Sequence, residues 1–432
     1  MSAPNIGTID RNEYSEVGAA IAAHEFYSVD IFDTLLYRLC RSPIDVFRFM
    51  EQRADVVQAT RHFTDYRVAA EQLARDDAKD RGAEDVSLSE IYDCFQELSD
   101  CTSEQATTVQ QIELETERML LQPTNFGRRF LSHVQQTGKR FVLTSDMYLP
   151  RAFLEDVLID KGIEGWEYLF VSNEQGRTKQ TGTLFEDVVA HFGVDSAKIL
   201  HIGDNKHGDG RMALKAGLES YLVPASKDLA ARSRIARKHS HLFNGTRPLS
   251  QVFAAHYFEK HHFEADRLDF RQLSDDAYFE AVGAVLVAPV MMSMMFWLKA
   301  GMEKRGMHRV AFLARDGMFP KAAFDLLWPD GFETQYVAAS RRVLTLPFSQ
   351  LDERLIHGMF LSTLKGCADL DDFLKAIAAG AKLRGLFESS GIDLNKKFTT
   401  KRRERVLEIL KNNPEAVYWS FENERESVSR YY

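Results

Sequence analysis

Cysteine is scarce in this sequence: there are four in 432 residues, and no two of them form a Cys-x-x-Cys pair. No cluster of cysteine and histidine has the spacing of a zinc site, so a disulfide scaffold and a zinc-finger protein are both excluded. So few cysteines in a long chain are typical of free thiols in a reducing compartment, and we expect a cytoplasmic protein. They are Cys40, Cys94, Cys101 and Cys367.

Signals for export and for general nucleic-acid binding are also lacking. The first residues, MSAPNIGTIDRNEYSE, hold no apolar core and do not resemble a signal peptide. The 54 Lys and Arg residues are outnumbered by 63 Asp and Glu residues, which gives a formal net charge of −9. A general nucleic-acid binder carries a basic excess, so we expect no nucleic-acid partner.

Long hydrophobic runs are nearly absent. One stretch, Ala281 to Leu298, has 18 residues without a charge, which is the lower limit for a membrane-spanning helix. It contains Pro289 and a methionine-rich run, and its flanks hold no one-sided basic cluster. We therefore expect a buried core helix here and no membrane span.

The composition is otherwise that of a folded globular protein, with 45% hydrophobic and 27% charged residues. Strand and helix patterns alternate from residue 123 to 226, which is typical of a parallel, doubly wound α/β sheet. A first strand pattern over 25–30 precedes a block of helical pattern in which Ser87–Glu90 and Thr102–Gln105 are capping boxes. We predict a Rossmann-like sheet with an inserted block of four helices.

The predicted domains follow from these patterns. Residues 1–228 form the first α/β domain, with its core in 24–41 and 122–228 and its helical insertion in 42–121. Residues 229–272 are predicted to be a helical linker. Residues 273–432 are predicted to be a second α/β domain with a helical tail, because strand patterns at 309–314 and 335–339 flank a helical pattern at 318–327.

Three predicted strands of the first domain end in acid or hydroxyl groups, at Asp30, Ser145 and Asp204. The carboxyl ends of parallel strands line one crevice, so Asp30, Asp204 and Asp209 should meet there. Carboxylates at ~5 Å repel by several kcal/mol, and a proton or a cation must relieve that repulsion. Oxygen ligands of this kind favour Mg²⁺, and Lys179 in a polar loop supplies further positive charge.

These residues stand in four motifs whose order resembles that of the haloacid dehalogenase-like (HAD) hydrolase superfamily, helical-cap type. The resemblance covers roughly residues 25–224, and the helical insertion looks like the family's cap. The motifs are the strand ending in Asp30-Ile31-Phe32-Asp33-Thr34, the strand ending in Ser145 seven residues after Gly138, Lys179 in GRTKQTG, and Gly203-Asp204 followed by Asp209.

The resemblance implies a role for each motif residue. Asp30 would be the nucleophile that takes up a phosphoryl group as an aspartyl-phosphate. Thr34 and Ser145 would hydrogen-bond the phosphoryl oxygens, and Lys179 would neutralise their charge. Mg²⁺ would be held by Asp30, Asp204 and Asp209, with the backbone carbonyl of Phe32 as a further ligand.

One position departs from the family's phosphatases, which carry a second Asp two residues after the nucleophile to protonate the leaving oxygen. Phe32 occupies that place here. General-acid catalysis contributes about 10²–10⁴-fold, so we expect weak hydrolysis of alkyl phosphates and better hydrolysis of phosphates with good leaving groups. Two alternatives remain open: a catalytically weak binding or scaffold module, and a metal-independent dehalogenase, against which the Asp204 and Asp209 pair argues.

Other polar residues near the motifs are candidates for substrate binding. Asp146 is predicted either to contact substrate or to cap the next helix, and Asn205 either to contact substrate or to orient Asp204. His207, between the acids of the fourth motif, is a further candidate. Asp33 and His201 are interpreted as a turn or cap residue and a core residue.

The second domain also carries a resemblance. Its string FLARDG, which is followed by a strand into ASRR, resembles a bacterial subgroup of these hydrolases associated with glycosyltransferases of surface-polysaccharide synthesis. The string SDMYL of the first domain, residues 145–149, fits the same subgroup. This implies a sugar-phosphate or nucleotide-sugar substrate and a glycosyltransferase partner, and that the domain ending in Tyr431-Tyr432 is incomplete. Arg315, Arg341 and Arg342 are expected either to clamp an anion or to form a salt-bridged interface.

Overall fold

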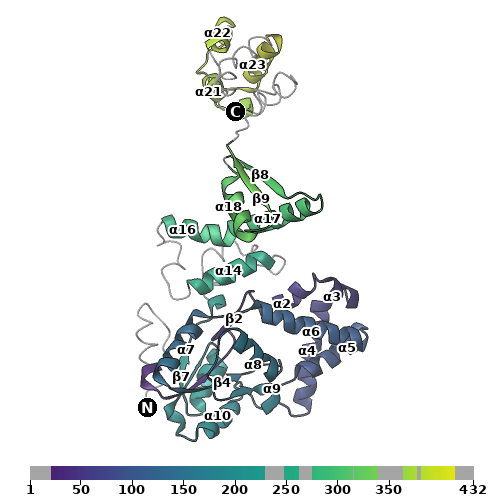
Figure 1. Cartoon of the computed structure of the whole chain (residues 1–432), viewed down its shortest axis with the longest axis vertical. Coiled ribbons are helices and arrows are strands. Elements are labelled where there is room, and N and C mark those ends of the chain that lie inside the picture. The colour runs from purple at the N-terminus through teal and green to yellow at the C-terminus, as the bar shows by residue number, and fades with distance from the viewer. Residues whose placement is uncertain are drawn as a thin grey trace. The chain divides into compact units, whose positions relative to one another are not determined.

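The computed structural model describes residues 21–228, 248–261, 275–314, 316–338, 363–376 and 381–413. The chain divides into two compact units, Met1–Ser293 and Met294–Tyr432, which we describe separately (Figure 1). Arg315, Arg341 and Arg342 lie outside the described residues, as does the Tyr431-Tyr432 pair, so the predictions for them stay predictions.

A five-stranded parallel sheet forms the centre of the first unit, as the sequence predicts. The strand order is β5-β4-β1-β6-β7, and the strands are β1 (Phe26–Val29), β4 (Arg140–Ser145), β5 (Leu169–Val171), β6 (Ile199–Gly203) and β7 (Glu219–Leu222). β1 lies between β4 and β6, with Val29 level with Leu143 and Ile202. The central strands are apolar because helices cover both of their faces.

Helices connect the strands and cover the two faces of the sheet (Figure 1). Phe130 packs on Tyr27 of β1 on one face, and Phe185 packs on His201 of β6 on the other. The two faces differ because neighbouring positions along a strand point in opposite directions. The helical segments are α7 (Asn125–Thr137), α8 (Arg151–Asp160), α9 (Ser172–Gln175), α10 (Leu184–Phe192), η1 (Ser196–Lys198), η2 (Lys206–Met212) and α11 (Ala213–Lys215).

The insertion begins after β2 (Leu36–Arg38) and ends at β3 (Leu121–Pro123), and these two strands pair in an antiparallel fashion. It contains five helices rather than the predicted four, because residues 42–62 form two short helices. Both predicted capping boxes are present, at Ser87 with Glu90 and at Thr102 with Gln105. The five helices are α2 (Pro43–Met50), α3 (Ala54–Ala59), α4 (Phe63–Asp80), α5 (Leu88–Ser99) and α6 (Ser103–Leu120).

Part of the predicted linker is instead packed on the first unit. Helix α14 (Pro248–Lys260) places Glu259 on Asn125, whose backbone N–H donates to the Glu259 carboxylate at 2.7 Å. Gln251 of the same helix accepts a hydrogen bond from the backbone N–H of Arg41 at 3.2 Å. The first unit therefore extends beyond the predicted boundary at residue 228.

The apolar run lies in a continuous helical stretch made of α16 (Asp275–Val282), η4 (Gly283–Val287) and α17 (Ala288–Glu303). The stretch from Tyr278 to Glu303 is long and apolar enough to cross a membrane, which is weak evidence by itself. Only 22% of the apolar 18-residue segment of this helix is buried. The prediction that the helix is buried in a core is therefore wrong. Periodicity alone does not show which faces of an apolar helix find a partner.

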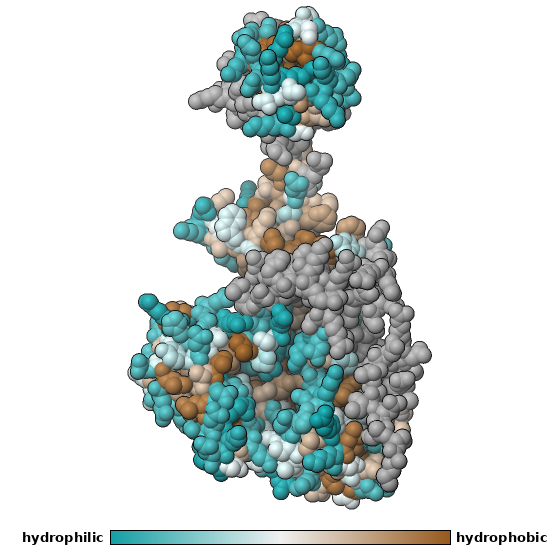
Figure 2. Space-filling model, turned by 180° about the vertical axis from the view of Figure 1, so that it is seen from behind, coloured by the Kyte–Doolittle hydropathy of each residue, from teal (hydrophilic) through white to brown (hydrophobic). Residues whose placement is uncertain are grey.

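The second unit contains the predicted strand–helix–strand arrangement. Strands β8 (Arg309–Leu313) and β9 (Glu333–Val337) pair in parallel, and α18 (Met318–Leu327) connects them. Figure 2 shows hydrophobic residues on the surface of this part of the molecule. Trp297, Phe319 and Leu326 are among the exposed hydrophobic side chains. A separate cluster of buried residues joins α21 (Leu370–Ala376), α22 (Ala381–Ser389) and α23 (Thr400–Asn412).

Candidate active site

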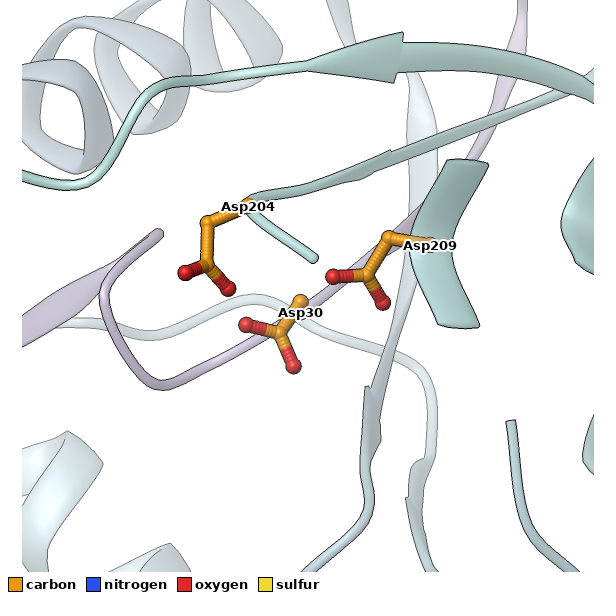
Figure 3. A group of neighbouring side chains, drawn as sticks. All are labelled: Asp30, Asp204 and Asp209. Atoms are coloured by element: carbon orange, nitrogen blue, oxygen red, sulfur yellow. The ribbon is translucent and has the colours of Figure 1, made fainter. Parts of the chain in front are cut away.

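The structure brings the three predicted acids together at the carboxyl ends of the central strands. Asp30 follows β1, Asp204 follows β6, and Asp209 projects from η2, with the three side chains facing one another (Figure 3). One carboxylate oxygen from each lies within 4.8 Å of the others. Gly203 allows this approach, since a Cβ atom there would meet Asp209 Cγ at 2.2 Å.

Lys179 lies against two of these acids. Its ammonium nitrogen donates to Asp30 Oδ1 at 2.5 Å and to Asp209 Oδ1 at 2.6 Å, and all three side chains are buried. Burial would lower the pKa of Lys179, but the two carboxylates outweigh it and raise that pKa. The side chain is therefore a fixed cation at the site.

A hydrogen-bonded network behind the site holds Asp209. His201 Nε2 lies 3.0 Å from Asp209 Oδ1, and His201 Nδ1 lies 2.8 Å from the hydroxyl of Ser28. Burial lowers the pKa of His201, so the neutral ring donates from Nε2 and accepts at Nδ1. Asp209 Oδ2 also accepts from the backbone N–H of Asn205 at 2.9 Å. Burial would raise the pKa of Asp209, but Lys179 and His201 keep it well below its usual range.

His201 is buried as the sequence predicts, and it is also part of the site, which sequence reasoning missed. The available signal was a polar residue in an otherwise apolar central strand, three positions before Asp204.

A second lysine, which sequence reasoning did not single out, stands at the edge of the acid cluster. Lys227 forms an ion pair with Asp33, and its ammonium nitrogen lies 4.0 Å from Asp204 Oδ2. Asp33 has a left-handed backbone conformation, with φ of 60°. Asp33 is thus a turn residue, as predicted, that also contributes charge to the site. Lys227 had one usable signal: it follows the last strand of the sheet, at the end where the other site residues gather.

The acids remain crowded in spite of the two lysines. Burial, together with the charge of Asp209, raises the pKa of Asp30 to about 7, even though Lys179 acts in the opposite direction. Burial and the charges of Asp30 and Asp33 raise the pKa of Asp204 to about 8. If all four carboxylates were ionised, they would exceed the two ammonium groups by two negative charges, which a divalent cation would balance. The donor set of buried carboxylate oxygens fits Mg²⁺.

The remaining motif residues lie around this cluster. Thr34 is fully buried, and its hydroxyl has no partner with good hydrogen-bond geometry, although it is close enough to Asp30 to lower the pKa of that carboxyl. Such an unsatisfied hydroxyl suits a site that receives polar oxygens. Ser145 is the buried last residue of β4. The ring of Phe32 packs under the guanidinium of Arg38, whose Cζ lies 4.4 Å from the ring centroid.

The three candidate substrate-binding residues each have a partner in the protein. Asp146 accepts from the backbone N–H groups of Lys179 at 2.7 Å and Gln180 at 3.0 Å, so it holds the Lys179 loop. It is not the cap of α8, whose N-cap is Pro150. The Asn205 side chain caps η2, and half-buried His207 places Nε2 3.2 Å from the Gln180 carbonyl. No observation tests whether these residues contact substrate.

Comparisons with known proteins agree with the motifs. The family model for HAD-hydrolase-like proteins matches residues 177–245, which include Lys179, Asp204 and Asp209. No curated protein matches the chain. The match supports the HAD-like hydrolase superfamily for the first unit, in agreement with the four motifs and the parallel sheet.

Solved structures also match part of the chain, and three of them have the following extent of similarity. A 2-haloacid dehalogenase from Pseudomonas syringae pv. Tomato DC3000 is 14% identical over 46% of this chain and 85% of its own, with a TM-score of 0.35. YfnB of Bacillus subtilis, described as a HAD-hydrolase bound to magnesium, is 17% identical over 46% of this chain and 87% of its own, with a TM-score of 0.35. A HAD family enzyme from Bacteroides thetaiotaomicron, in complex with magnesium and inorganic phosphate, is 14% identical over 51% of this chain and 100% of its own, with a TM-score of 0.32.

Proposed function

We propose that the first unit is a Mg²⁺-dependent phosphohydrolase that acts through Asp30. The observation that carries this proposal is the arrangement of one buried carboxylate, Asp30, between the Lys179 ammonium and the acids Asp204 and Asp209. The Lys179 ammonium is one cation beside this carboxylate. The oxygens of Asp30, Asp204 and Asp209 form a site that could hold a second cation, Mg²⁺. Both cations would stabilise the negative charge of a phosphoryl group in transfer.

The reaction would proceed in two displacements. A carboxylate oxygen of Asp30 forms a bond to phosphorus while the bond to the leaving oxygen breaks, which gives an aspartyl-phosphate. Water then attacks the phosphorus, and the Asp30 carboxylate and inorganic phosphate are released. Lys179 opposes the effect of burial on the pKa of Asp30 and so favours the ionised nucleophile, and the Thr34 hydroxyl is available to a phosphoryl oxygen.

Mg²⁺ would be held by Asp30, Asp204 and the Phe32 carbonyl, with Asp209 as a further ligand through Oδ2. When bound, the metal would supply Lewis-acid stabilisation of phosphoryl charge. Asp209 Oδ1 is already engaged by Lys179 and His201, so the main work of that residue in the protein is to fix Lys179.

The substrate class follows from what position 32 lacks. An acid at position 32 would protonate the leaving oxygen, but this position holds Phe32, which has no proton to donate. The ring of Phe32 packs against the guanidinium of Arg38. We therefore propose a substrate whose leaving group is a weak base. Candidates are a nucleotide sugar, or a sugar phosphate or other phosphate with a good leaving group. From the resemblance to the bacterial subgroup we further propose that such a substrate is met in the cytoplasm, in partnership with a glycosyltransferase of surface-polysaccharide synthesis.

The deciding experiment is hydrolysis of an activated aryl phosphate by the purified chain, with Mg²⁺ and with EDTA. We expect turnover with Mg²⁺ only, and its loss by at least about 10³-fold in Asp30→Asn, since the amide is no nucleophile. Turnover of the aryl phosphate that survives EDTA would contradict the Mg²⁺ dependence, whereas release of halide from a haloacid in EDTA would favour a dehalogenase. The absence of turnover in both conditions would favour a binding or scaffold role.

A further inference from the structure

The turn between α4 and α5 of the helical insertion reaches the loop that carries Lys179. One oxygen of Glu84, Oε2, accepts four hydrogen bonds there. The donors are the backbone N–H of Thr178 at 2.8 Å and the hydroxyls of Thr178 at 3.1 Å, Thr181 at 2.7 Å and Thr183 at 2.7 Å. Three threonines within six residues thus converge on a single carboxylate of another part of the chain.

The same turn also binds the neighbouring loops of the sheet. The Asp85 carboxylate accepts from the hydroxyl of Ser172, which in turn accepts from the backbone N–H of Met147 at 2.9 Å. Leu88 donates its backbone N–H to the Tyr148 carbonyl at 2.9 Å. The insertion is therefore joined to the loops that follow both β4 and β5.

The Lys179 loop is held from two sides. Asp146 accepts the backbone N–H groups of Lys179 and Gln180, while Glu84 accepts from the threonines before and after them. Partial burial would raise the pKa of Glu84, but the threonine hydrogen bonds outweigh it and lower that pKa, so the acceptor is a full carboxylate. Hydrogen bonds to a charged acceptor are about twice as strong as neutral ones.

We propose that Glu84 is a positioning residue by which the helical insertion holds the Lys179 ammonium on Asp30. The proposal rests on the function proposed above for Asp30 and Lys179. Glu84 touches no reacting atom and acts through the Thr178–Thr183 loop. Because Glu84 is exposed, water competes for its hydrogen bonds, so the effect of its removal should be moderate.

The test uses the full chain and two variants of the contact. Glu84→Ala removes the acceptor, and Glu84→Gln keeps one acceptor oxygen without its charge. Asp80→Asn is the matched control, because it removes an exposed negative charge four residues away on the same insertion.

The first measurements need no turnover. Hydrogen exchange of the backbone over residues 177–184 should be about 10-fold faster in Glu84→Ala and intermediate in Glu84→Gln. Acylation of the Lys179 amine, which is buried in the native protein, should accelerate in the same order. Asp80→Asn should match the native protein in both. Native rates in Glu84→Ala would overturn the proposal.

The kinetic measurement separates positioning from general loss of structure. With an activated aryl phosphate and Mg²⁺, kcat should fall about 10-fold in Glu84→Ala while KM changes little, and Glu84→Gln should recover part of kcat. A rise in KM at unchanged kcat would overturn the positioning role. If the native chain has no turnover, the proposed function fails, and the exchange and acylation rates still decide whether Glu84 holds the loop.

Discussion

At the scale of single residues, the side chain of Phe32 is fixed by its neighbour. Arg38 stacks on the ring and is itself paired with Glu117 of α6, at 2.9 Å. The guanidinium would therefore lie close to an acid placed at position 32. An opposite charge within about 4–6 Å lowers the pKa of a carboxyl group by one to three units.

The sequence alone suggests that Phe32→Asp would restore a general acid, and Arg38 changes that expectation. We predict that the new carboxylate stays ionised beside Arg38, so that hydrolysis of an alkyl phosphate by Phe32→Asp stays within about 3-fold of that by Phe32→Asn. The two variants match in shape and differ in acidity. If the Asp variant hydrolyses the alkyl phosphate about 10²-fold faster than the Asn variant, Arg38 does not keep the new carboxylate ionised.

The raised pKa values of Asp30 and Asp204, about 7 and about 8, predict how stability depends on pH. Over roughly pH 4 to 8 the folded protein binds more protons at these residues than the unfolded chain, so stability falls as the pH rises. In EDTA we expect the melting temperature of the first unit to fall by on the order of 5 °C between pH 5 and pH 8.

Mg²⁺ should suppress that fall, because the metal balances the charge of the ionised acids. Asp204→Asn should also flatten the profile in EDTA, since it removes one of the two titrating acids. Thermal unfolding followed by circular dichroism measures both effects. A melting temperature in EDTA that stays constant or rises from pH 5 to pH 8 would contradict the raised pKa values of Asp30 and Asp204.

At the scale of elements, the close approach of β6 and η2 depends on Gly203. A methyl group there would collide with Asp209, whose Cγ lies 2.2 Å from the position of the Cβ atom. Asp209 holds Lys179 and is a candidate metal ligand. The end of β6 therefore tolerates no side chain at this residue.

We predict that Gly203→Ala lowers Mg²⁺-dependent turnover by at least about 10²-fold. A displacement of about 1 Å in an active site can lower the rate by this factor, and Asp209 must move further than that to make room for the methyl group. Gly208→Ala is the matched control in the same segment, since its nearest neighbour would be Lys179 Cβ at 3.6 Å, an ordinary contact. Mg²⁺ titration by calorimetry should show weaker binding in Gly203→Ala alone. Equal loss in both variants would point to general disruption of η2.

At the scale of the whole molecule, the boundary of the first unit decides how the chain can be cut. Lys227 lies at the site and must be kept, while α14 contributes Glu259 and Gln251 to the surface of the first unit. A fragment of residues 1–228 keeps every described site residue and loses the contacts of α14. At about 1 kcal/mol for each hydrogen bond, these two contacts account for a loss of about 2 kcal/mol.

We predict that the 1–228 fragment is soluble, melts at a lower temperature than the first unit of the full chain, and keeps aryl-phosphate turnover within about 10-fold. Gel filtration, thermal unfolding and the hydrolysis assay measure these three properties. A fragment that aggregates would show that α14 is an obligatory part of the domain.

The local features of this protein were determined by the sequence itself. The strand pattern over 25–30 predicts β1, and the alternation of strand and helix patterns over 123–226 predicts the parallel strands β4, β5, β6 and β7, because a buried parallel strand must be apolar on both faces. The positions of Asp30, Asp204 and Asp209 at strand ends predict their meeting, since parallel strands present the same ends to one edge. Both capping boxes are equally local, each a reciprocal pair within one helical turn.

Only the tertiary structure decided which distant side chains complete the site. Lys227 and Asp33 are 194 positions apart, and Glu84 is 94 positions from Thr178, so no local spacing relates them. His201 could be predicted as buried, but its bond to Asp209 depends on how η2 folds back over β6. The same reason explains the error at the apolar helix, because burial depends on what packs against a face and not on the face alone.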